Sequence, residues 1–200
     1  MARDTRERIT TAAATLFRRQ GYTGTGLQQI AAESQTRVGS IYHFFTGGKD
    51  ALTAEVVRTG GVAYGAMVGR ILANGPDDPV DALGAMFEQA AVDLAATDYA
   101  DACPIATIAL EVASTNEPLR IATAEVFENW LQGLTAFCHQ IVDDPAGARD
   151  LAVAVLVTLE GAFILARAAR DPEPLLAAGR SVERLAAAVR TGSADINGTP

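Results

Sequence analysis

Residues 25–49 read TGLQQIAAESQTRVGSIYHFFTGGK and contain two short segments with helical periodicity, 26–34 and 37–44. Thr25 stands directly before the first segment, where a hydroxyl can cap a helix N-terminus. The inward positions of both segments are apolar, namely Leu27, Ile30, Ala31, Val38, Ile41, Tyr42 and Phe45. Two short helices with a tight connection predict a helix-turn-helix, whose second helix enters the major groove of DNA.

The flanking sequence completes a three-helix head. A helix at 4–20 has one apolar face and ends at Gly21, a residue that favours the left-handed conformation after a helix. That face consists of Ile9, Ala13, Leu16 and Phe17. Thr46-Gly47-Gly48 then breaks the chain before a long helix at 49–73.

The rest of the chain continues as helices, and no strand-like alternation stands out. Five further segments have helical periodicity, each with a proline at or near its start: 79–97, 104–115, 118–142, 146–169 and 172–189. The sequence therefore predicts an all-α fold of about nine helices, a helix-turn-helix head followed by a C-terminal helical bundle. We expect a DNA-binding domain at 1–50, with its motif at about 27–45, and a ligand-binding and dimerisation domain at 51–200.

The net charge of −8 is unevenly divided along the chain. Residues 1–50 hold seven basic and four acidic groups, a net charge of +3, whereas the remaining residues hold nine basic and twenty acidic groups, a net charge of −11. A basic end on an acidic body is typical of a protein that meets phosphate at one end. A chance partition of surface charge would give the same counts.

Several classes of protein are disfavoured. The N-terminus is charged from Arg3 onward, and the longest apolar run, 151–159, is shorter than a membrane span, so we expect a cytoplasmic protein with no membrane partner. The two cysteines, Cys103 and Cys138, suit small buried hydrophobes better than a redox sensor. The sequence has no nucleophile elbow, nucleotide-binding glycine motif or Cys-x-x-Cys pair, so we expect neither an enzyme nor a bound cofactor or metal ion.

One set of positions has a distinctive spacing: Arg8-Ile9, Ala13, Leu16-Phe17, Gly21-Tyr22, Thr25, Leu27, Ile30-Ala31, Gly39-Ser40-Ile41-Tyr42-His43-Phe44-Phe45, Lys49 and Leu52. This set, spread over residues 5–57, resembles the N-terminal signature of the TetR family of bacterial transcriptional regulators. The resemblance implies a TetR-like repressor that binds double-stranded operator DNA as a homodimer.

The resemblance and the outward positions of the second short helix together give the candidate DNA contacts: Thr25, Gln28, Thr36, Arg37, Ser40, Tyr42, His43 and Lys49. By similarity, Tyr42 and His43 contact phosphate or a thymine methyl, and Lys49 contacts a phosphate. Thr25 anchors the other side of the groove. Arg37 could read guanine, because its guanidinium matches O6 and N7. Two alternatives stay open, Arg37 as a solvated charge and Tyr42 as a core residue packed on Phe17.

The turn between the two short helices departs from the family pattern. Where the family has a small residue followed by Gly-Val-Ser, this chain has Ser34-Gln35-Thr36-Arg37. Without the glycine, the left-handed position of the turn falls on Gln35. This departure favours an alternative class, a helical binding protein that keeps the fold without reading DNA.

Further motifs extend beyond the head: Thr46-Gly47-Gly48-Lys49, Ala102-Cys103-Pro104-Ile105-Ala106, Ala109-Leu110-Glu111, Trp130, Leu159-Glu160-Gly161-Ala162 and 166–175. They resemble those of the LmrA/YxaF-like branch of the family. This branch implies release from DNA by small, hydrophobic, often aromatic compounds. The candidate pocket residues are the large apolar side chains Met86, Phe87, Phe127, Trp130, Leu134 and Phe163. Trp130 is the strongest of them, since its indole N–H needs a polar partner, although such a stripe also suits an ordinary core.

The last two predicted helices are rich in alanine, which permits close approach between helices. We expect this pair from each of two subunits to form a four-helix interface. The candidate interface residues are Leu156, Leu159, Ala162 and Leu185. Packing within one chain is the alternative.

Overall fold

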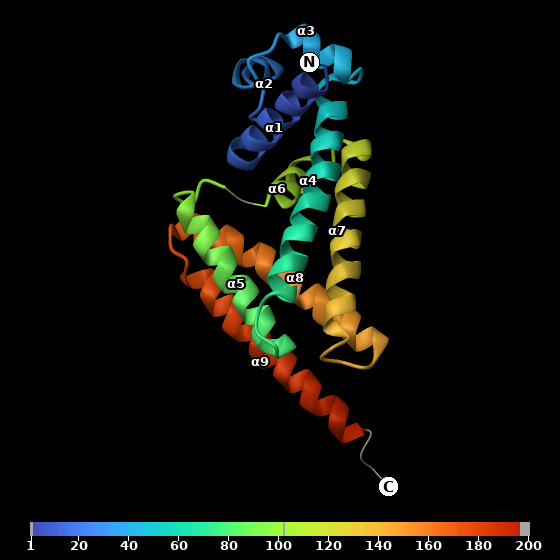
Figure 1. Cartoon of the computed structure of the whole chain (residues 1–200), viewed down its shortest axis with the longest axis vertical. Coiled ribbons are helices and arrows are strands. Elements are labelled where there is room, and N and C mark those ends of the chain that lie inside the picture. Colours follow the sequence, from blue (N-terminus) through green and yellow to red (C-terminus); the bar gives the residue numbers. More distant parts are fainter. Residues whose placement is uncertain (1, 102, 197–200) are drawn as a thin grey trace. The chain divides into compact units, whose positions relative to one another are not determined.

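The computed structural model describes residues 2–101 and 103–196, and the side chains of 3–101 and 103–191. Within this part of the chain there are nine α-helices and no β-strand (Figure 1). The helices are α1 (Ala2–Gln20), α2 (Leu27–Glu33), α3 (Val38–Phe44), α4 (Gly48–Ala73), α5 (Pro79–Ala96), α6 (Pro104–Val112), α7 (Glu117–Cys138), α8 (Pro145–Ala169) and α9 (Glu173–Ile196). The prediction of an all-α fold of about nine helices is confirmed.

The chain folds as two compact units, each assembled from two stretches of sequence. The head unit comprises Met1–Tyr64 and Asp101–Phe127, and the body unit comprises Gly65–Ala100 and Glu128–Pro200. The helices α1, α2, α3 and α6 belong to the head unit, and α5, α8 and α9 belong to the body unit, while α4 and α7 contribute to both. The predicted DNA-binding domain therefore lies within the head unit.

The core of the head unit contains apolar side chains from each of its first four helices. Ile9, Phe17, Ile30, Ile41 and Leu52 are fully buried. They hold α1 against α2 and α3. Tyr42 is the exception to the predicted apolar stripe, because it is 53% exposed. The interpretation of Tyr42 as a core residue is therefore wrong.

The start of α2 also differs from the prediction. The N-cap residue is Gly26. Its backbone N–H donates a hydrogen bond of 2.8 Å to Oε1 of Gln29. Thr25 is only 1% exposed, and its hydroxyl donates to the carbonyl of Gly21 at 2.7 Å. Thr25 closes the loop after α1 instead of capping α2. Its buried side chain is also a poor candidate for anchoring DNA.

Proline and a capping residue define the starts of three later helices. Asp78 accepts from the N–H of Val80 ahead of α5, and Asp144 accepts from the N–H of Gly147 ahead of α8. Cys103 precedes α6, and its Sγ accepts from the N–H of Ala106 at 3.5 Å; Ala102 before it lies outside the described residues. These contacts satisfy backbone donors that a helix start otherwise leaves open. The predicted helix starts at these prolines are confirmed to within a residue or two.

In the body unit, α9 packs against both α5 and α8. Glycines allow the close approach of α5 and α9: a Cβ at Gly179 would lie 2.9 Å from Cβ of Phe87 and 3.5 Å from the carbonyl oxygen of Gly84. By length and composition alone, α8 could cross a membrane, although 39% of its most apolar 18-residue window is buried within the protomer. Core helices of soluble proteins can have the same length and apolar composition, so these two properties alone are weak evidence that α8 spans a membrane.

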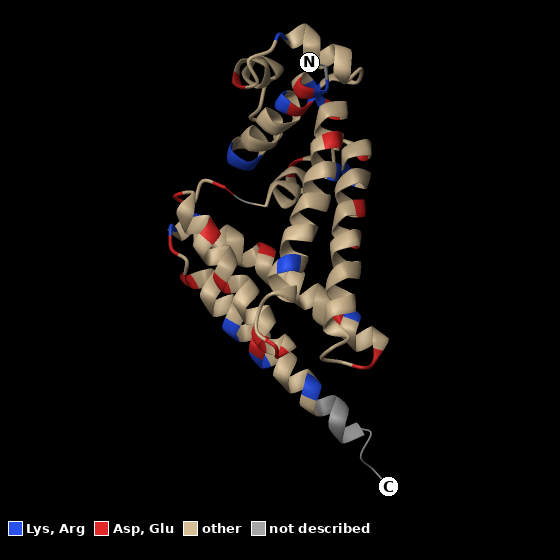
Figure 2. Cartoon of the chain, in the orientation of Figure 1, with Lys and Arg blue, Asp and Glu red and all other residues tan. Residues whose placement is uncertain are grey.

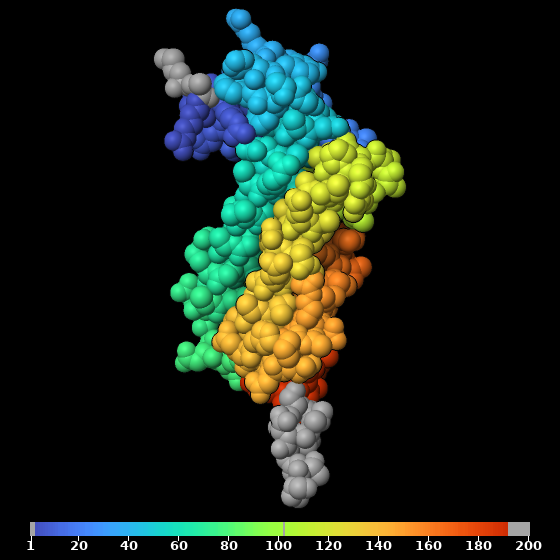
Figure 3. Space-filling view, turned by 90° about the vertical axis from the view of Figure 1, so that its right-hand side faces the viewer, coloured from blue at the N-terminus to red at the C-terminus, as the bar shows by residue number. Residues whose placement is uncertain are grey.

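The helices α4 and α7 run side by side, as the space-filling view shows in teal and in yellow to orange (Figure 3). In the head unit, a Cβ at Gly61 of α4 would lie 2.5 Å from Cγ1 of Val126. In the body unit, a Cβ at Gly65 would lie 3.1 Å from Cδ1 of Trp130. Glycine on α4 therefore makes room for larger side chains of α7 in both units.

Candidate nucleic-acid interface

The second helix of the helix-turn-helix, α3, presents polar and aromatic side chains to solvent. Arg37, its N-cap residue, is exposed, as are Tyr42 and His43, while Ser40 is half-buried. The ring of His43 meets Phe44 edge-on at 5.0 Å between ring centres. Because Ile41 on the opposite face is fully buried, the orientation of these exposed groups is fixed by the core.

Two other candidate contacts lie on or beside α2. Gln28 is exposed in the first turn of α2. Thr36 comes after that helix and is half-buried, and its hydroxyl lies 2.8 Å from the hydroxyl of Ser34. The structure therefore brings six of the eight predicted DNA contacts to an accessible part of the helix-turn-helix, with Lys49 and Thr25 as the two special cases.

Tyr42 and Lys49 are both positioned by the start of α4. The ring of Tyr42 lies against Gly48, where a Cβ would be 3.1 Å from Cε1, and Gly48 has a φ of +62°. The ammonium group of Lys49 lies 4.0 Å from the ring centre of Tyr22. Burial lowers the pKa of Lys49 below its ordinary value. The ammonium group of Lys49 thus already lies over an aromatic face, and its predicted contact with a phosphate stays a prediction.

Tyr22 connects several parts of the head unit, and the sequence reasoning assigned it no role. Its hydroxyl donates to Asp50 at the start of α4, and Asn116 donates to the other oxygen of Asp50 at 2.8 Å. Burial, together with the hydrogen bond to Asp50, raises the pKa of Tyr22 to about 12. Its ring also lies 6.3 Å from that of Phe17.

Glu111, in the last turn of α6, binds the loop after α1. Its carboxylate accepts hydrogen bonds from the backbone N–H of Tyr22 at 3.0 Å and of Thr23 at 2.6 Å. Two adjacent N–H groups directed at one carboxylate form a small anion-binding nest. The motif Ala109-Leu110-Glu111 pointed to this segment, but only the structure shows what Glu111 contacts.

Much of the positive charge of the head unit is already paired. Figure 2 shows basic residues at both ends of α1, with acidic residues among those of its first turns. Arg6 pairs with Glu55 at 2.8 Å and lies over the ring of Phe45, and Arg18 pairs with Asp101 at 3.3 Å. The net charge of +3 therefore overstates the charge that is free to meet phosphate.

The comparisons with known proteins agree with this geometry. Residues 9–56 match the family model described as bacterial regulatory proteins of the tetR family. Residues 79–181 match the model described as the C-terminal domain of LmrA/YxaF-like transcriptional regulators. The chain belongs to the TetR family. It is thus a DNA-binding transcriptional regulator of the LmrA/YxaF-like branch, and its relatives are regulators rather than enzymes.

Individual relatives resemble this TetR-family chain over most of its length. It is 31% identical to the HTH-type transcriptional regulator LmrA of Bacillus subtilis, over 86% of this chain and 92% of that protein. It is 34% identical to an uncharacterized HTH-type regulator of Mycobacterium tuberculosis, over 90% and 93% of the two chains. Among solved structures, a regulatory protein TetR from Rhodobacter sphaeroides has the same fold, with a TM-score of 0.80 and 19% identity over 89% and 96% of the chains.

The predicted pocket residues of this TetR-family regulator are mainly interior. Met86, Phe87, Leu134 and Phe163 are buried in the body unit, as is Trp130, while Phe127 of the head unit is half-buried. Phe87 lies at the contact between α5 and α9, which favours a packing role for that residue. The assignment of the others to an effector pocket stays a prediction.

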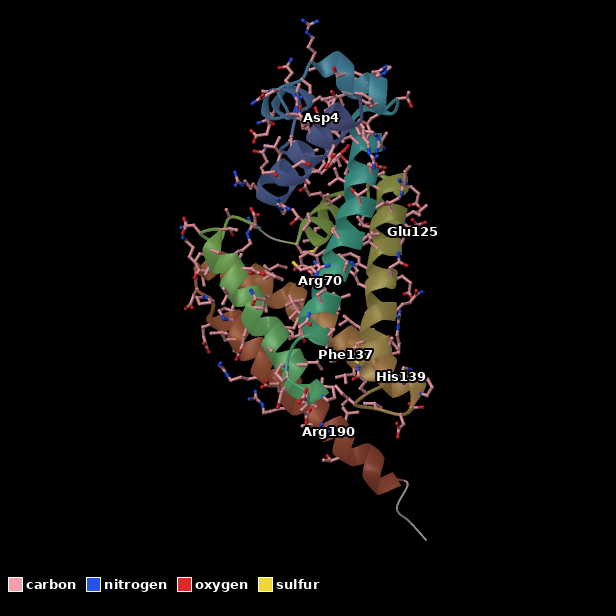
Figure 4. All side chains as sticks on the ribbon, viewed as in Figure 1. Asp4, Arg70, Glu125, Phe137, His139 and Arg190 are labelled. Atoms are coloured by element: carbon pink, nitrogen blue, oxygen red, sulfur yellow. The ribbon has the colours of Figure 1, made fainter. Side chains whose placement is uncertain are left out.

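The two cysteines and two histidines are the residues to consider for redox chemistry or metal binding. Cys103 and Cys138 are both buried, and burial raises the pKa of Cys138 to about 11, so its reactive thiolate is scarce at neutral pH. His43 lies on α3, and His139 comes directly after α7 (Figure 4). The described part of the chain contains no group of three or more His, Cys, Asp or Glu that could hold a metal ion.

Three of the four predicted dimer residues lie on α8 and are covered within the protomer, and the fourth lies on α9. Leu156, Leu159 and Ala162 are buried within the protomer, on the face that packs in the body unit. Leu185 on α9 is 43% exposed and stays available. The sequence pattern identified an apolar helix but did not show which of its faces the protomer covers.

Proposed function

We propose that this chain is a repressor that binds operator DNA as a homodimer and is released by a small apolar effector. In this proposal residues 1–50 bind DNA, and residues 51–200 bind the effector and the partner subunit. The observation that carries the DNA-reading role is the outward face of α3. Arg37, Tyr42 and His43 are exposed there, while Ile41 fixes the helix in the core. Such a face can offer base contacts from Arg37 and phosphate contacts from its neighbours.

The outward face of α8 supports dimerisation. Its exposed apolar side chains are Val153, Val157, Ile164 and Leu165, at 38%, 64%, 58% and 62% exposure. They share one side of the helix with Gly161, which is also exposed. An uncovered apolar stripe of this length suits an interface between two copies of the chain, and we place the interface here together with Leu185. A two-fold dimer would present two α3 helices to half-sites about 34 Å apart.

The effector in this proposal is a largely apolar, ring-containing molecule. In this proposal its binding site is formed by deformable or aromatic side chains that are buried in the body unit, Met86, Trp130, Leu134 and Phe163. Release would require that the effector bind best to a conformer whose reading helices no longer match the operator. A movement of α6 would act directly on the DNA-reading part, because Glu111 is bonded to the loop before α2.

The proposal is tested by selecting DNA fragments from a random pool and measuring the salt dependence of binding. We expect enrichment of a palindromic site, and an affinity that falls by several powers of ten between low and high salt. A screen of apolar ring compounds against that complex then tests release. If no palindromic site is enriched, or if no compound of this class releases the complex, the proposal of an effector-released dimeric repressor is contradicted.

A further inference from the structure

The turn between α2 and α3 holds a residue in a backbone conformation that favours glycine. Gln35 has a φ of +53°. The N–H of Gln35 donates to the carbonyl of Ala32 at 3.0 Å, and the N–H of Thr36 donates to that of Ala31 at 2.8 Å. This pair of bonds is a Schellman motif, in which the left-handed position is usually glycine because a Cβ is disfavoured there. Because a Cβ raises the free energy of this conformation, a contact that holds the backbone of Gln35 would stabilise the turn.

Arg8 of α1 supplies that contact. Its Nε and Nη2 donate to the carbonyl of Ser34 at 3.1 and 2.6 Å, and Nη2 also donates to the carbonyl of Gln35 at 2.8 Å. The Schellman bonds leave these two carbonyls without a partner from the helix, so Arg8 completes the C-terminus of α2. Its positive charge is also favourable at the negative end of the helix. The planar fork of arginine can meet two adjacent carbonyls in a way that a lysine ammonium cannot.

The contact bears on DNA reading because α3 begins directly after the turn. Arg37, the N-cap of α3, comes two residues after Gln35. The Ser34 hydroxyl donates to the carbonyl of Ile30 at 2.7 Å and lies 2.8 Å from the Thr36 hydroxyl, which ties the turn to α2. The buried Ile41 anchors α3 in the core, and the backbone that Arg8 contacts connects α3 to the end of α2.

The surroundings of Arg8 do not suit a phosphate. Nη1 of Arg8 lies 3.7 Å from a carboxylate oxygen of Asp4, one turn earlier on α1 (Figure 4). The open groove beside Arg8 has a volume of about 510 Å³, and its lining includes Asp4, Glu7 and Glu33. Three carboxylates repel a phosphate, and the guanidinium is already directed at backbone carbonyls. A direct contact between Arg8 and DNA is therefore the less favoured role.

We propose that Arg8 is a positioning residue for DNA reading: it holds the left-handed Gln35 turn and so fixes α3 relative to α2. This inference rests on the proposed function. It adds a residue that touches no base but determines how well α3 fits its groove. It also explains how the chain keeps a helix-turn-helix where the family's glycine is absent.

The test measures dissociation constants for the selected operator and for a shuffled duplex of equal length. The variants are Arg8→Met, Gln35→Gly and the double variant; methionine keeps an unbranched stem without the donors. We expect Arg8→Met to weaken operator binding at least tenfold and shuffled-duplex binding less than threefold. A misaligned α3 loses its base contacts, whereas the phosphate contacts that bind any duplex are retained. Gln35→Gly alone should stay within twofold of the wild type. Added to Arg8→Met, it should restore operator binding to within threefold, since glycine holds the turn unaided.

Two controls separate positioning from charge and from folding. Arg3→Met removes the same charge from an exposed site on α1, and should shift both duplexes by a similar small factor. Arg8→Lys keeps the charge and should show the same selective loss of operator binding. If Arg8→Met is unfolded at the assay temperature, Arg8→Lys is the variant that tests the inference. The inference is overturned if Arg8→Met weakens both duplexes equally, if Arg8→Lys binds as the wild type, or if Gln35→Gly gives no rescue. A wild-type protein that binds neither duplex would instead reject the proposed function.

Discussion

The carboxylate of Glu111 occupies the space that a side chain at Gly21 would need: a Cβ built on Gly21 would lie 1.9 Å from Oε1 of Glu111. Gly21 also has a φ of +75°, so two independent constraints select glycine. The end of α1 is therefore shaped by a residue that lies ninety positions later in the sequence, on α6.

Replacing Gly21 by alanine should destabilise the protein by at least about 2 kcal/mol, because the left-handed conformation and the displaced carboxylate both add cost. Urea unfolding measures the change. Gly133→Ala on α7 is the control, since a Cβ there meets nothing within 4 Å, and it should be neutral or mildly stabilising. Equal stability of the two variants would contradict the assigned contact.

Glu111→Gln should weaken the hydrogen bonds from the N–H groups of Tyr22 and Thr23, because the amide keeps one acceptor oxygen in place of two and loses the charge that strengthens both bonds. We expect a loss of about 1–2 kcal/mol, with faster hydrogen exchange at these two amides than in the wild type. Glu125→Gln, at an exposed site on α7 (Figure 4), provides the matched control. Unchanged protection of both amides would show that Glu111 does not hold this loop in solution.

Stability should also depend on pH through Tyr22. Its pKa is raised to about 12 in the folded protein, while an unfolded tyrosine titrates near 10. The folded state thus keeps the proton longer, so the stabilisation is complete below pH of about 10 and is lost as pH rises toward 12. Ultraviolet titration of tyrosinate should show one late-titrating group that disappears in Tyr22→Phe. A Tyr22→Phe protein with the same titration curve, apart from one ordinary tyrosine fewer, would contradict this.

The sequence predicted where helices begin and end better than it predicted which face of each helix is buried and which helix covers it. Periodicity and proline placement located α5 and α8, because both signals are local. Which face of α8 is covered depends on α9, and hence Leu156 and Leu159 were assigned to the dimer interface although the protomer buries them. Tyr42 fitted an apolar stripe by spacing, yet it lies exposed beside Gly48.

In the candidate DNA-binding site, too, the sequence predicted local conformation but not contacts between distant residues. The left-handed conformation of Gln35 was predicted correctly, because Gln35 stands where the family pattern has glycine. Its stabilisation by Arg8, and the bonds from Tyr22 to Glu111 and Asp50, join residues that are distant in the chain. No local pattern encodes such pairs.

A charge on the outer face of α8 should split the proposed dimer. We expect Val157→Glu to sediment as a monomer, because an unpaired carboxylate buried in an interface costs several kcal/mol. Leu110→Glu places the same charge on α6 at a side chain that is 77% exposed, and should leave the dimer intact. If Val157→Glu stays dimeric while Leu110→Glu dissociates, the interface lies on α6 instead.

The account depends most on α3 reading DNA, and DNA selection with sequencing of the retained fragments tests it most directly. The wild type should enrich a palindrome whose half-sites lie about one helical turn apart, 10–10.5 base pairs between centres. Arg37→Ala should enrich the same palindrome with relaxed preference at one base position in each half-site, while its affinity for shuffled duplex changes little. A wild-type protein that enriches no motif, or an Arg37→Ala protein that enriches an identical one, would contradict the account.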